Sequence, residues 1–300
     1  MKKTIFLLTY NRPAETRRCL HAIKNAKGSK EYELVVVRQT GNSAVEAIID
    51  DIDWIKAYHH VTNPHSAWSA ARAINHNMYT GVSLSFEMYQ SDFVVVVEDD
   101  VLIGFDFLKF CEQILKIHEK DPKFFAVNGF SSENYRADKL ACYGKFRFGL
   151  GWGWAVHKNV WKNKMLPVWT GSEETIWDVH LEPTVRKGFV VMPFCSRVQN
   201  IGWCGSVHTS SNPDDPFYSK FRKSFVGFEP FAVNQYVYDP GVSSSWRKDC
   251  IRYDRWVFFK ELNVKMFRKI KYQSHLRSLA AKIPSKSLWQ FFNIQKSSHN

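Results

Sequence analysis

The first 130 residues alternate between short apolar runs and segments whose apolar residues recur at helical spacing. Short runs rich in β-branched residues are typical of strands buried on both faces, as in a parallel sheet. Because the two kinds of segment alternate, the pattern predicts an α/β fold with a mostly parallel, doubly wound sheet. The expected strands are 4–9, 34–37, 54–60, 93–97 and 124–127, and the expected helices are 14–26, 43–49, 66–78 and 106–119.

The middle third of the chain has a different pattern. A glycine–aromatic run at 149–154 leads into an apolar segment that is expected to be a strand. Residues 173–186 have a helical pattern that Pro183 is expected to interrupt, because proline lacks the N–H that a helix interior needs. Residues 189–192 predict a further strand, and 205–220 predict a loop rich in Ser, Asn, Asp and Pro.

The composition is that of an ordinary globular protein, with 300 residues of which 45% are apolar and 23% charged. The net charge of +12 is concentrated at the end of the chain: from 247 to 300 there are thirteen Lys or Arg and three Asp or Glu. This tail is predicted to be helical, with an apolar stripe of Phe259, Leu262, Met266 and Ile270 beside basic residues. A basic amphipathic helix favours an anionic membrane surface. Packing on the domain that precedes the tail is a compatible alternative, and no nucleic-acid-binding motif supports a nucleic acid partner.

Cysteine usage and the N-terminus indicate the compartment. Six scattered cysteines include no Cys-x-x-Cys pair, which argues against a thiolate metal site or a disulfide framework and favours reduced cytosolic thiols. The apolar run after Lys3 is too short for a signal peptide, and no run of eighteen apolar residues predicts a membrane span. We therefore expect a cytoplasmic protein that associates peripherally with the cytosolic face of a membrane.

The strand expected at 93–97 runs directly into Glu98, Asp99 and Asp100. Ligands bind at the carboxyl edge of the strands in open α/β sheets. Three consecutive carboxylates repel each other unless a cation or hydrogen-bond donors lie nearby. A divalent ion that bridges a carboxylate to a diphosphate would resolve the repulsion, and Mn²⁺ or Mg²⁺ suits oxygen ligands. The alternative is a loop of solvated acids after a strand.

Four motifs carry a resemblance to a known family. The chain resembles nucleotide-sugar-dependent glycosyltransferases of the GT-A fold, and most of all the inverting N-acetylglucosaminyltransferase I group and its bacterial relatives, over roughly residues 4–212. The resemblance implies a catalytic domain at 1–245, with a nucleotide-sugar half at 1–130 and an acceptor half at 131–245, and then a basic tail at 246–300. The motifs are Thr9-Tyr10-Asn11-Arg12-Pro13, Glu98-Asp99-Asp100, Gly151–Val156, and Trp177-Asp178 followed by Ser196–Gly202 and Ser206-Val207-His208.

The same resemblance implies the donor site. The nucleotide base and ribose are expected beside the residues that follow the first strand, although Arg12 could instead pair with a surface acid. Relatives often have an acid that reads the base at the end of the second strand, so Arg38 and Gln39 leave the nucleotide open; a UDP-sugar is the first expectation. Arg72 is expected to bind the diphosphate as a bidentate guanidinium, with an exposed helical arginine as the alternative. The donor-site residues are Thr9, Tyr10, Asn11, Arg12, Arg38, Gln39, Arg72, Glu98, Asp99, Trp152 and Gly153.

By the same resemblance Asp100 is the direct metal ligand, with Glu98 and Asp99 near the ribose, the sugar or metal-bound water. His208 is either a second metal ligand or a hydrogen-bonded loop histidine. Trp152 and Gly153 are expected where the backbone lies close to a ligand and an indole stacks on a sugar.

An inverting transferase needs a general base that takes the proton from the acceptor hydroxyl. Asp178 is the candidate, and Glu173 and Glu174 are the alternatives. Relatives have two successive acids after the tryptophan, whereas Val179 stands second here, which leaves the register open by one residue.

These motifs predict a metal-dependent, inverting glycosyltransferase that acts on a glycan or lipid-linked acceptor in surface polysaccharide biosynthesis. A nucleotidyltransferase is an alternative, although Thr9–Pro13 is not the glycine-rich, lysine-containing phosphate loop that such an enzyme usually has. A non-catalytic carbohydrate-binding or membrane-docked protein is another, and the intact Asp100 and Asp178 argue against it.

Overall fold

A computed structural model describes residues 2–55, 58–131, 133–147, 150–202 and 224–242. They belong to the first of two units of the chain, Met1–Ser244; the second unit is Ser245–Asn300. His208, the loop expected at 205–220 and the basic tail expected at 246–300 lie outside the described residues.

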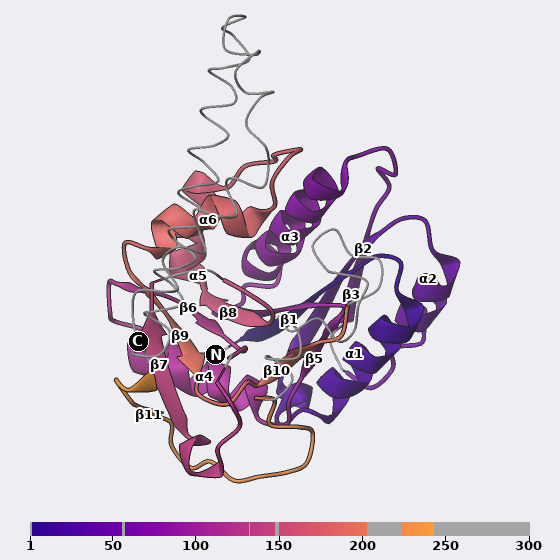
Figure 1. Cartoon of the computed structure of the whole chain (residues 1–300). Helices are drawn as coiled ribbons and strands as arrows, with labels where there is room; N and C mark the ends of the chain where they lie inside the picture. Colours follow the sequence, from indigo (N-terminus) through magenta and orange to yellow (C-terminus); the bar gives the residue numbers. More distant parts are fainter. Residues whose placement is uncertain (1, 56–57, 132, 148–149, 203–223, 243–300) are drawn as a thin grey trace, which may run out of the picture. The chain divides into compact units, whose positions relative to one another are not determined.

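The described residues form a nine-stranded sheet (Figure 1) and a separate two-stranded ladder. The strands of the sheet are β1 (Lys3–Thr9), β2 (Glu33–Gln39), β3 (Tyr58–Asn63), β4 (Phe93–Glu98), β6 (Phe124–Asn128), β7 (Cys142–Phe146), β8 (Trp154–His157), β9 (Phe189–Pro193) and β11 (Val237–Tyr238). The ladder pairs β5 (Val101–Ile103) with β10 (Val198–Asn200) in antiparallel orientation.

The strand order is β11-β7-β9-β6-β8-β4-β1-β2-β3. The strands β4, β1, β2 and β3 are parallel, whereas β8 runs antiparallel between β4 and β6. The prediction of an α/β fold with a mostly parallel central sheet is therefore confirmed. Because four neighbouring parallel strands end at one edge, the residues that follow β1, β2 and β4 are brought to the same side of the molecule.

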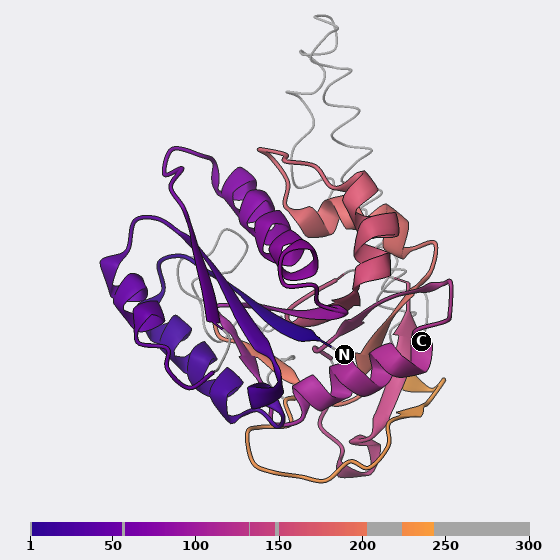
Figure 2. The same cartoon turned by 180° about the vertical axis from the view of Figure 1, so that it is seen from behind.

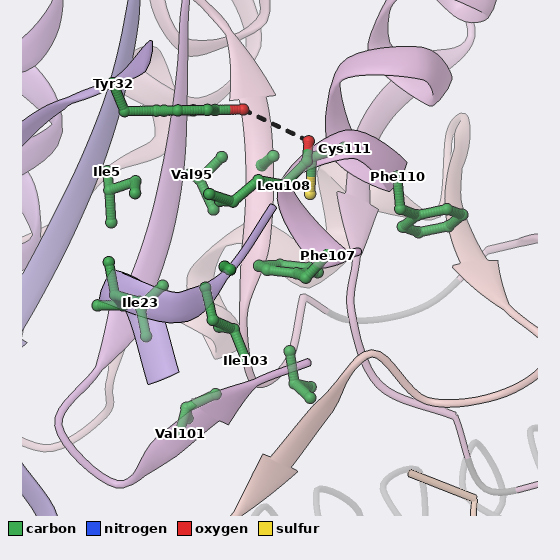
Figure 3. Packing of buried hydrophobic residues seen from close by; sticks show 14 of the residues in the cluster. Ile5, Ile23, Tyr32, Val95, Val101, Ile103, Phe107, Leu108, Phe110 and Cys111 are labelled. Atoms are coloured by element: carbon green, nitrogen blue, oxygen red, sulfur yellow. Dashed lines mark hydrogen bonds between the residues drawn. The ribbon is translucent and has the colours of Figure 1, made fainter. Parts of the chain in front are cut away.

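Helices cover both faces of the sheet, as the views from the two sides in Figures 1 and 2 show. On one face, Ile5 of β1 and Val95 of β4 belong to a core with Ile23 and Phe107, two residues of helices on that face (Figure 3). On the other face, Gly81 of helix α3 (Ala70–Glu87) packs on the ring of Phe6. The other helices are α1 (Pro13–Asn25), α2 (Ser43–Asp50), α4 (Phe107–His118), α5 (Lys158–Val160) and α6 (Trp177–Val185). Three short 3₁₀ helices are η1 (Ser29–Glu31), η2 (Ala137–Lys139) and η4 (Leu166–Val168), and η3 (Trp161–Met165) is a π-helix.

Local capping explains where several helices begin. Pro13 occupies the first turn of α1, where its missing N–H has no intrahelical partner in any case. Asn42 caps α2, since its side chain accepts from the backbone N–H groups of Ala44 and Val45. Ser69 caps α3 by accepting from Arg72 N, so this helix begins at Ala70 and not at the expected residue 66.

The prediction that Pro183 interrupts the helix is wrong. Helix α6 begins at Trp177, later than the expected residue 173, and continues through Pro183 to Val185. Pro183 lies near the carboxyl end, where it removes only one hydrogen bond of a short helix. Arg186 N still donates to Glu182 O at 3.1 Å, so the last turn remains closed.

A buried arginine fixes the β5–β10 ladder to the rest of the fold. Arg197 is fully buried, and its Nη2 lies 3.3 Å from Asp106 Oδ2, at the start of α4. The Tyr236 hydroxyl donates to the same carboxylate, and the guanidinium lies 5.2 Å from the Phe110 ring centroid. Arg197 Nη1 also donates to Cys195 O at 2.7 Å. Since a buried charge is tolerated only when it is paired and bonded, this network holds the chain beside β5.

Within the described residues, no helix is long and apolar enough to cross a membrane.

The packing of α3 on β1 predicts a specific sensitivity at Gly81. A Cβ at this position would overlap the Phe6 ring. Gly81→Val gains about 0.5 kcal/mol in helix propensity, but overpacking costs roughly 1–3 kcal/mol, so we expect net destabilisation. Urea unfolding of this variant should be compared with Gly171→Val, because nothing lies within 4 Å of a Cβ at Gly171. Equal unfolding midpoints would contradict the close approach of α3 to the sheet.

Candidate active site

The three acids predicted from the sequence lie at the centre of the sheet's carboxyl edge. Glu98 is the last residue of β4, and Asp99 and Asp100 form the turn into β5. Strand β4 lies between β1 and β8, so this turn faces both halves of the sheet. Asp99 and Asp100 are both buried. The alternative of a solvated acidic loop is therefore wrong.

Residues that follow β1 hold the acids. Arg12 Nη1 lies 3.0 Å from Asp99 Oδ1 and 2.7 Å from Asp100 Oδ2, and its side chain is 20% exposed. Asp99 Oδ2 accepts from Tyr10 N at 3.0 Å and from the Thr9 hydroxyl at 3.2 Å. The arginine thus pairs with two acids of the site and not with a surface acid.

The chain segment after β10 closes over Asp100. Ile201 N donates to Asp100 O at 2.7 Å, and a Cβ on Gly202 would overlap the Asp100 carboxylate. The side chain of Asn200 hydrogen-bonds Asp100, which partly opposes the increase that burial causes in the pKa of Asp100, and Asn200 Oδ1 accepts from Gly202 N at 2.9 Å. Asn200 belongs to the Ser196–Gly202 motif but was not predicted as a site residue, since its role depends on the β5–β10 pairing.

The acids perturb one another strongly. Burial, followed by the charges of Asp100, Asp99 and Asp178, raises the pKa of Glu98 to about 8. Burial and Asp100 raise the pKa of Asp99 to about 6, against the opposing effect of Arg12. Burial also raises the pKa of Asp100, again opposed mainly by Arg12. Burial is thus the main cause of the three raised pKa values, and Arg12 opposes it by favouring the charged forms.

The chemistry of these acids fits a hard divalent cation. Carboxylate oxygens are the preferred ligands of Mn²⁺ and Mg²⁺, and a cation would relieve the repulsion between Asp99 and Asp100. Within the described ranges, no group of three or more His, Cys, Asp or Glu side chains is arranged to hold a metal ion by itself. The predicted second ligand, His208, lies outside those ranges.

Asp178 is the second residue of α6. It follows Trp177, whose ring packs on that of Trp154 in β8 at a centroid distance of 5.3 Å. Its charge is one of those that raise the pKa of Glu98, after burial, Asp100 and Asp99. The two alternatives precede α6: Glu173 pairs with Arg72 at 2.6 Å, and Glu174 is exposed.

Other predicted donor residues already have partners in the fold. Arg38 is buried, with Nη2 2.7 Å from Glu46 Oε1. Gln39 Nε2 donates to His65 O at 2.9 Å. Arg72 pairs with Glu173 and lies 4.5 Å from the ring centroid of Trp68. Asn11 is exposed beside the start of α1, and Tyr10 presents half of its surface to solvent.

Gly153 and Trp152 pack within the fold. Gly153 has a φ of +60°, a conformation that favours glycine, and a Cβ there would lie 2.7 Å from Val198 Cγ1. Its carbonyl accepts from Gly129 N at 2.7 Å. The Trp152 ring meets Phe130 edge-on at a centroid distance of 5.9 Å. Packing thus accounts for this glycine, and a contact of Trp152 with a sugar stays a prediction.

Comparison with known proteins identifies relatives. The family model described as the GNT-I family matches residues 2–229. This match includes all four motifs and confirms the resemblance predicted from them.

Solved structures give more distant similarities. They include S. aureus TarS (13% identity, TM-score 0.46, 64% of this chain and 35% of that one). A second is S. aureus TarS 1–349 in complex with UDP (12% identity, TM-score 0.47, 64% of this chain and 57% of that one). A third is the mannosyltransferase PcManGT from Pyrobaculum calidifontis in complex with GDP-Man and Mn²⁺ (16% identity, TM-score 0.44, 65% of this chain and 57% of that one). The chain thus spans 35% to 57% of the lengths of these three chains.

The charge balance predicts how Arg12→Gln behaves. Removing the arginine leaves buried carboxylates uncompensated, which should destabilise the fold by roughly 2–4 kcal/mol. Mn²⁺ should recover part of this loss, because a cation replaces the missing charge. Arg38→Gln is the matched control, since it removes a buried arginine that pairs with Glu46, away from the acidic turn. Thermal unfolding with and without Mn²⁺ measures both effects, and equal Mn²⁺ responses of the two variants would contradict the charge balance.

Proposed function

Because the chain belongs to the GNT-I family, we propose that it is a glycosyltransferase that moves a sugar from a nucleotide-sugar donor to a glycan or lipid-linked acceptor. The observation that carries this proposal is the acidic turn after β4, which pairs with Arg12 and lies close enough to Asp178 for the charge of Asp178 to raise the pKa of Glu98. The turn supplies ligands for a cation, and Asp178 supplies a base. A nucleotidyltransferase or a non-catalytic binder has no comparable support.

The donor is proposed to lie along the carboxyl ends of β1, β2 and β4, with a UDP-sugar as the first candidate. Asp100 would hold Mn²⁺ or Mg²⁺, and His208 is a second candidate ligand. When bound, the ion would neutralise the negative charge that develops on the departing diphosphate. Arg12 is a cationic side chain at this edge and is proposed to orient Asp99 and Asp100 through its two ion pairs.

Asp178 is proposed as the general base of an inverting reaction. It would accept the proton of the acceptor hydroxyl as that oxygen attacks the anomeric carbon from the face opposite the diphosphate. Glu173 is the weaker candidate because its carboxylate pairs with Arg72. Glu174 is exposed and stays an alternative.

A screen of donors tests the function directly. Thermal unfolding should be measured with Mn²⁺ and UDP-, GDP-, CMP- and dTDP-sugars in turn. A donor at a hundred times its dissociation constant stabilises a protein by about 2.7 kcal/mol. No stabilisation by any of them would contradict the proposal.

Asp100→Ala should abolish transfer and remove the metal-dependent part of the donor affinity, because Asp100 is the carboxylate that the proposal assigns to the metal. The measurement is nucleoside diphosphate release and donor binding with and without Mn²⁺. Asp51→Ala is the control, since Asp51 is an exposed residue after α2. Normal turnover with an intact Mn²⁺ response would show that the metal assignment is wrong.

Asp178→Asn should leave donor affinity nearly unchanged and lower turnover by roughly 10²–10⁴, the usual contribution of a general base. Steady-state kinetics and calorimetry of donor binding separate the two effects. Retained turnover would move the role to Glu173 or Glu174, or indicate a retaining mechanism.

The basic tail is proposed to dock the enzyme on an anionic membrane, in surface polysaccharide biosynthesis at the cytosolic face. The support is the excess of ten positive charges between 247 and 300. Deleting 256–300 should weaken binding to anionic vesicles, and full-length binding should fall as salt rises. Unchanged vesicle binding after the deletion would contradict this role.

A further inference from the structure

Asn75 of α3 is fully buried, and its amide group holds the loop that precedes α6. Nδ2 donates to Ser172 O at 3.0 Å and to Thr175 O at 2.9 Å. Oδ1 is buried and has no hydrogen-bond partner among the described residues. Asparagine is a weak helix former, and burying a polar group is unfavourable unless it is bonded. The two bonds to the loop are therefore the interaction that accounts for an asparagine at this position.

Two further residues on the same side of α3 reach the same loop. Ser69 Oγ donates to Glu173 O at 3.2 Å, and Arg72 Nη1 lies 2.6 Å from Glu173 Oε1. The two side chains of this ion pair are 42% and 58% exposed, and exposed ion pairs contribute little to stability. The buried amide of Asn75 is thus the stronger attachment between α3 and the loop.

The loop connects this attachment to Asp178 through a short, internally bonded path. Ser172 Oγ accepts from Glu174 N at 3.1 Å and from Thr175 N at 3.2 Å. Thr175 Oγ1 lies 3.1 Å from Nε2 of His180 in α6. Asp178 follows Thr175 by three residues and lies in the first turn of the same helix. A shift of residues 172–175 would therefore be passed to the start of α6.

We propose that Asn75 is a positioning residue for Asp178: it fixes residues 172–175 and thereby sets where the Asp178 carboxylate lies relative to Glu98. This inference rests on the proposed role of Asp178 as the base. A side chain of the nucleotide-sugar half thus sets the geometry of the acceptor half. Proton transfer requires the base within hydrogen-bond reach of the acceptor hydroxyl, so a displacement of about 1 Å can lower the rate by two orders of magnitude.

Hydrogen–deuterium exchange of the full chain tests the structural step without any substrate. In Asn75→Ala, peptides that cover 172–178 should exchange at least about tenfold faster than in the wild type. Ser85→Ala is the matched control, because Ser85 is a buried residue of the same helix whose hydroxyl donates to Gly81 O at 2.7 Å. Its exchange at 172–178 should stay unchanged. Equal exchange of this segment in Asn75→Ala and the wild type would overturn the proposal.

Kinetics test the catalytic step, with the nucleotide sugar that stabilises most in the donor screen as substrate and Mn²⁺ present. Asn75→Ala should lower kcat by about 10- to 100-fold and change the donor KM by less than about twofold. Asn75→Ser keeps one donor and should give an intermediate kcat; it also serves as the test variant if Asn75→Ala does not fold.

A double mutant separates this inference from the proposed function. If Asn75 acts through Asp178, then Asn75→Ala should lower the rate of Asp178→Asn by no more than about threefold. Fully additive losses would overturn the positioning role while leaving Asp178 as the base. If Asp178→Asn alone has no effect on the rate, the assignment of Asp178 as the base is wrong. The exchange data then still decide whether Asn75 holds the loop.

Discussion

Three successive carboxylates at the end of a buried strand repel each other, and the fold around them is arranged to compensate. Asp99 and Asp100 lie where water provides little screening, so each needs donors or a cation. Arg12 pairs with both, Tyr10 N and the Thr9 hydroxyl donate to Asp99, and Asn200 bonds to Asp100. Burial, followed by the charges of Asp100, Asp99 and Asp178, still raises the pKa of Glu98 to about 8. A buried acidic edge of this kind is suited to a divalent ion, and the ion in turn can bind a diphosphate.

Much of this compensation comes from residues far away in the sequence. The parallel pairing of β1 with β4 brings Arg12 to the acidic turn, and the β5–β10 ladder brings Asn200 and Gly202 to Asp100. The ladder in turn depends on Arg197, whose buried charge is paired with Asp106. A charge pair beside α4 therefore helps to set the position of the candidate metal ligand. The loop that Asn75 holds is proposed to have the same role for Asp178.

The sequence predicts the central sheet well because the apolar runs of β1, β2 and β4 are buried and leave a strong signal. It also predicts the acidic turn, and a motif identifies Asp178 as a candidate base, which stays a prediction. It does not predict β5 and β10, because strands of three residues have no period to detect. Asn200 depends on the β5–β10 pairing and Asn75 on contacts with the loop at 172–175, so neither was identified.

Other differences each have their own cause. Gly153 is explained by its positive φ and by Val198, a residue whose proximity no local pattern indicates. Pro183 was expected to interrupt a helix that in fact begins four residues later, and which tolerates proline near its end. Arg72 has the residue type and helix position of a phosphate-binding arginine, yet in this structure it pairs with Glu173, 101 residues away in the sequence.

We propose that the acidic turn after β4 binds a divalent ion that also contacts the donor diphosphate. Crystals of the full chain grown with Mn²⁺ and UDP test it most directly, because manganese gives anomalous scattering that locates the ion. We expect an anomalous peak that places Mn²⁺ within bonding distance of the Asp100 carboxylate and of diphosphate oxygens at the carboxyl edge of β4. UDP bound at this edge with no peak beside Asp100, or a peak elsewhere in the molecule, would contradict it.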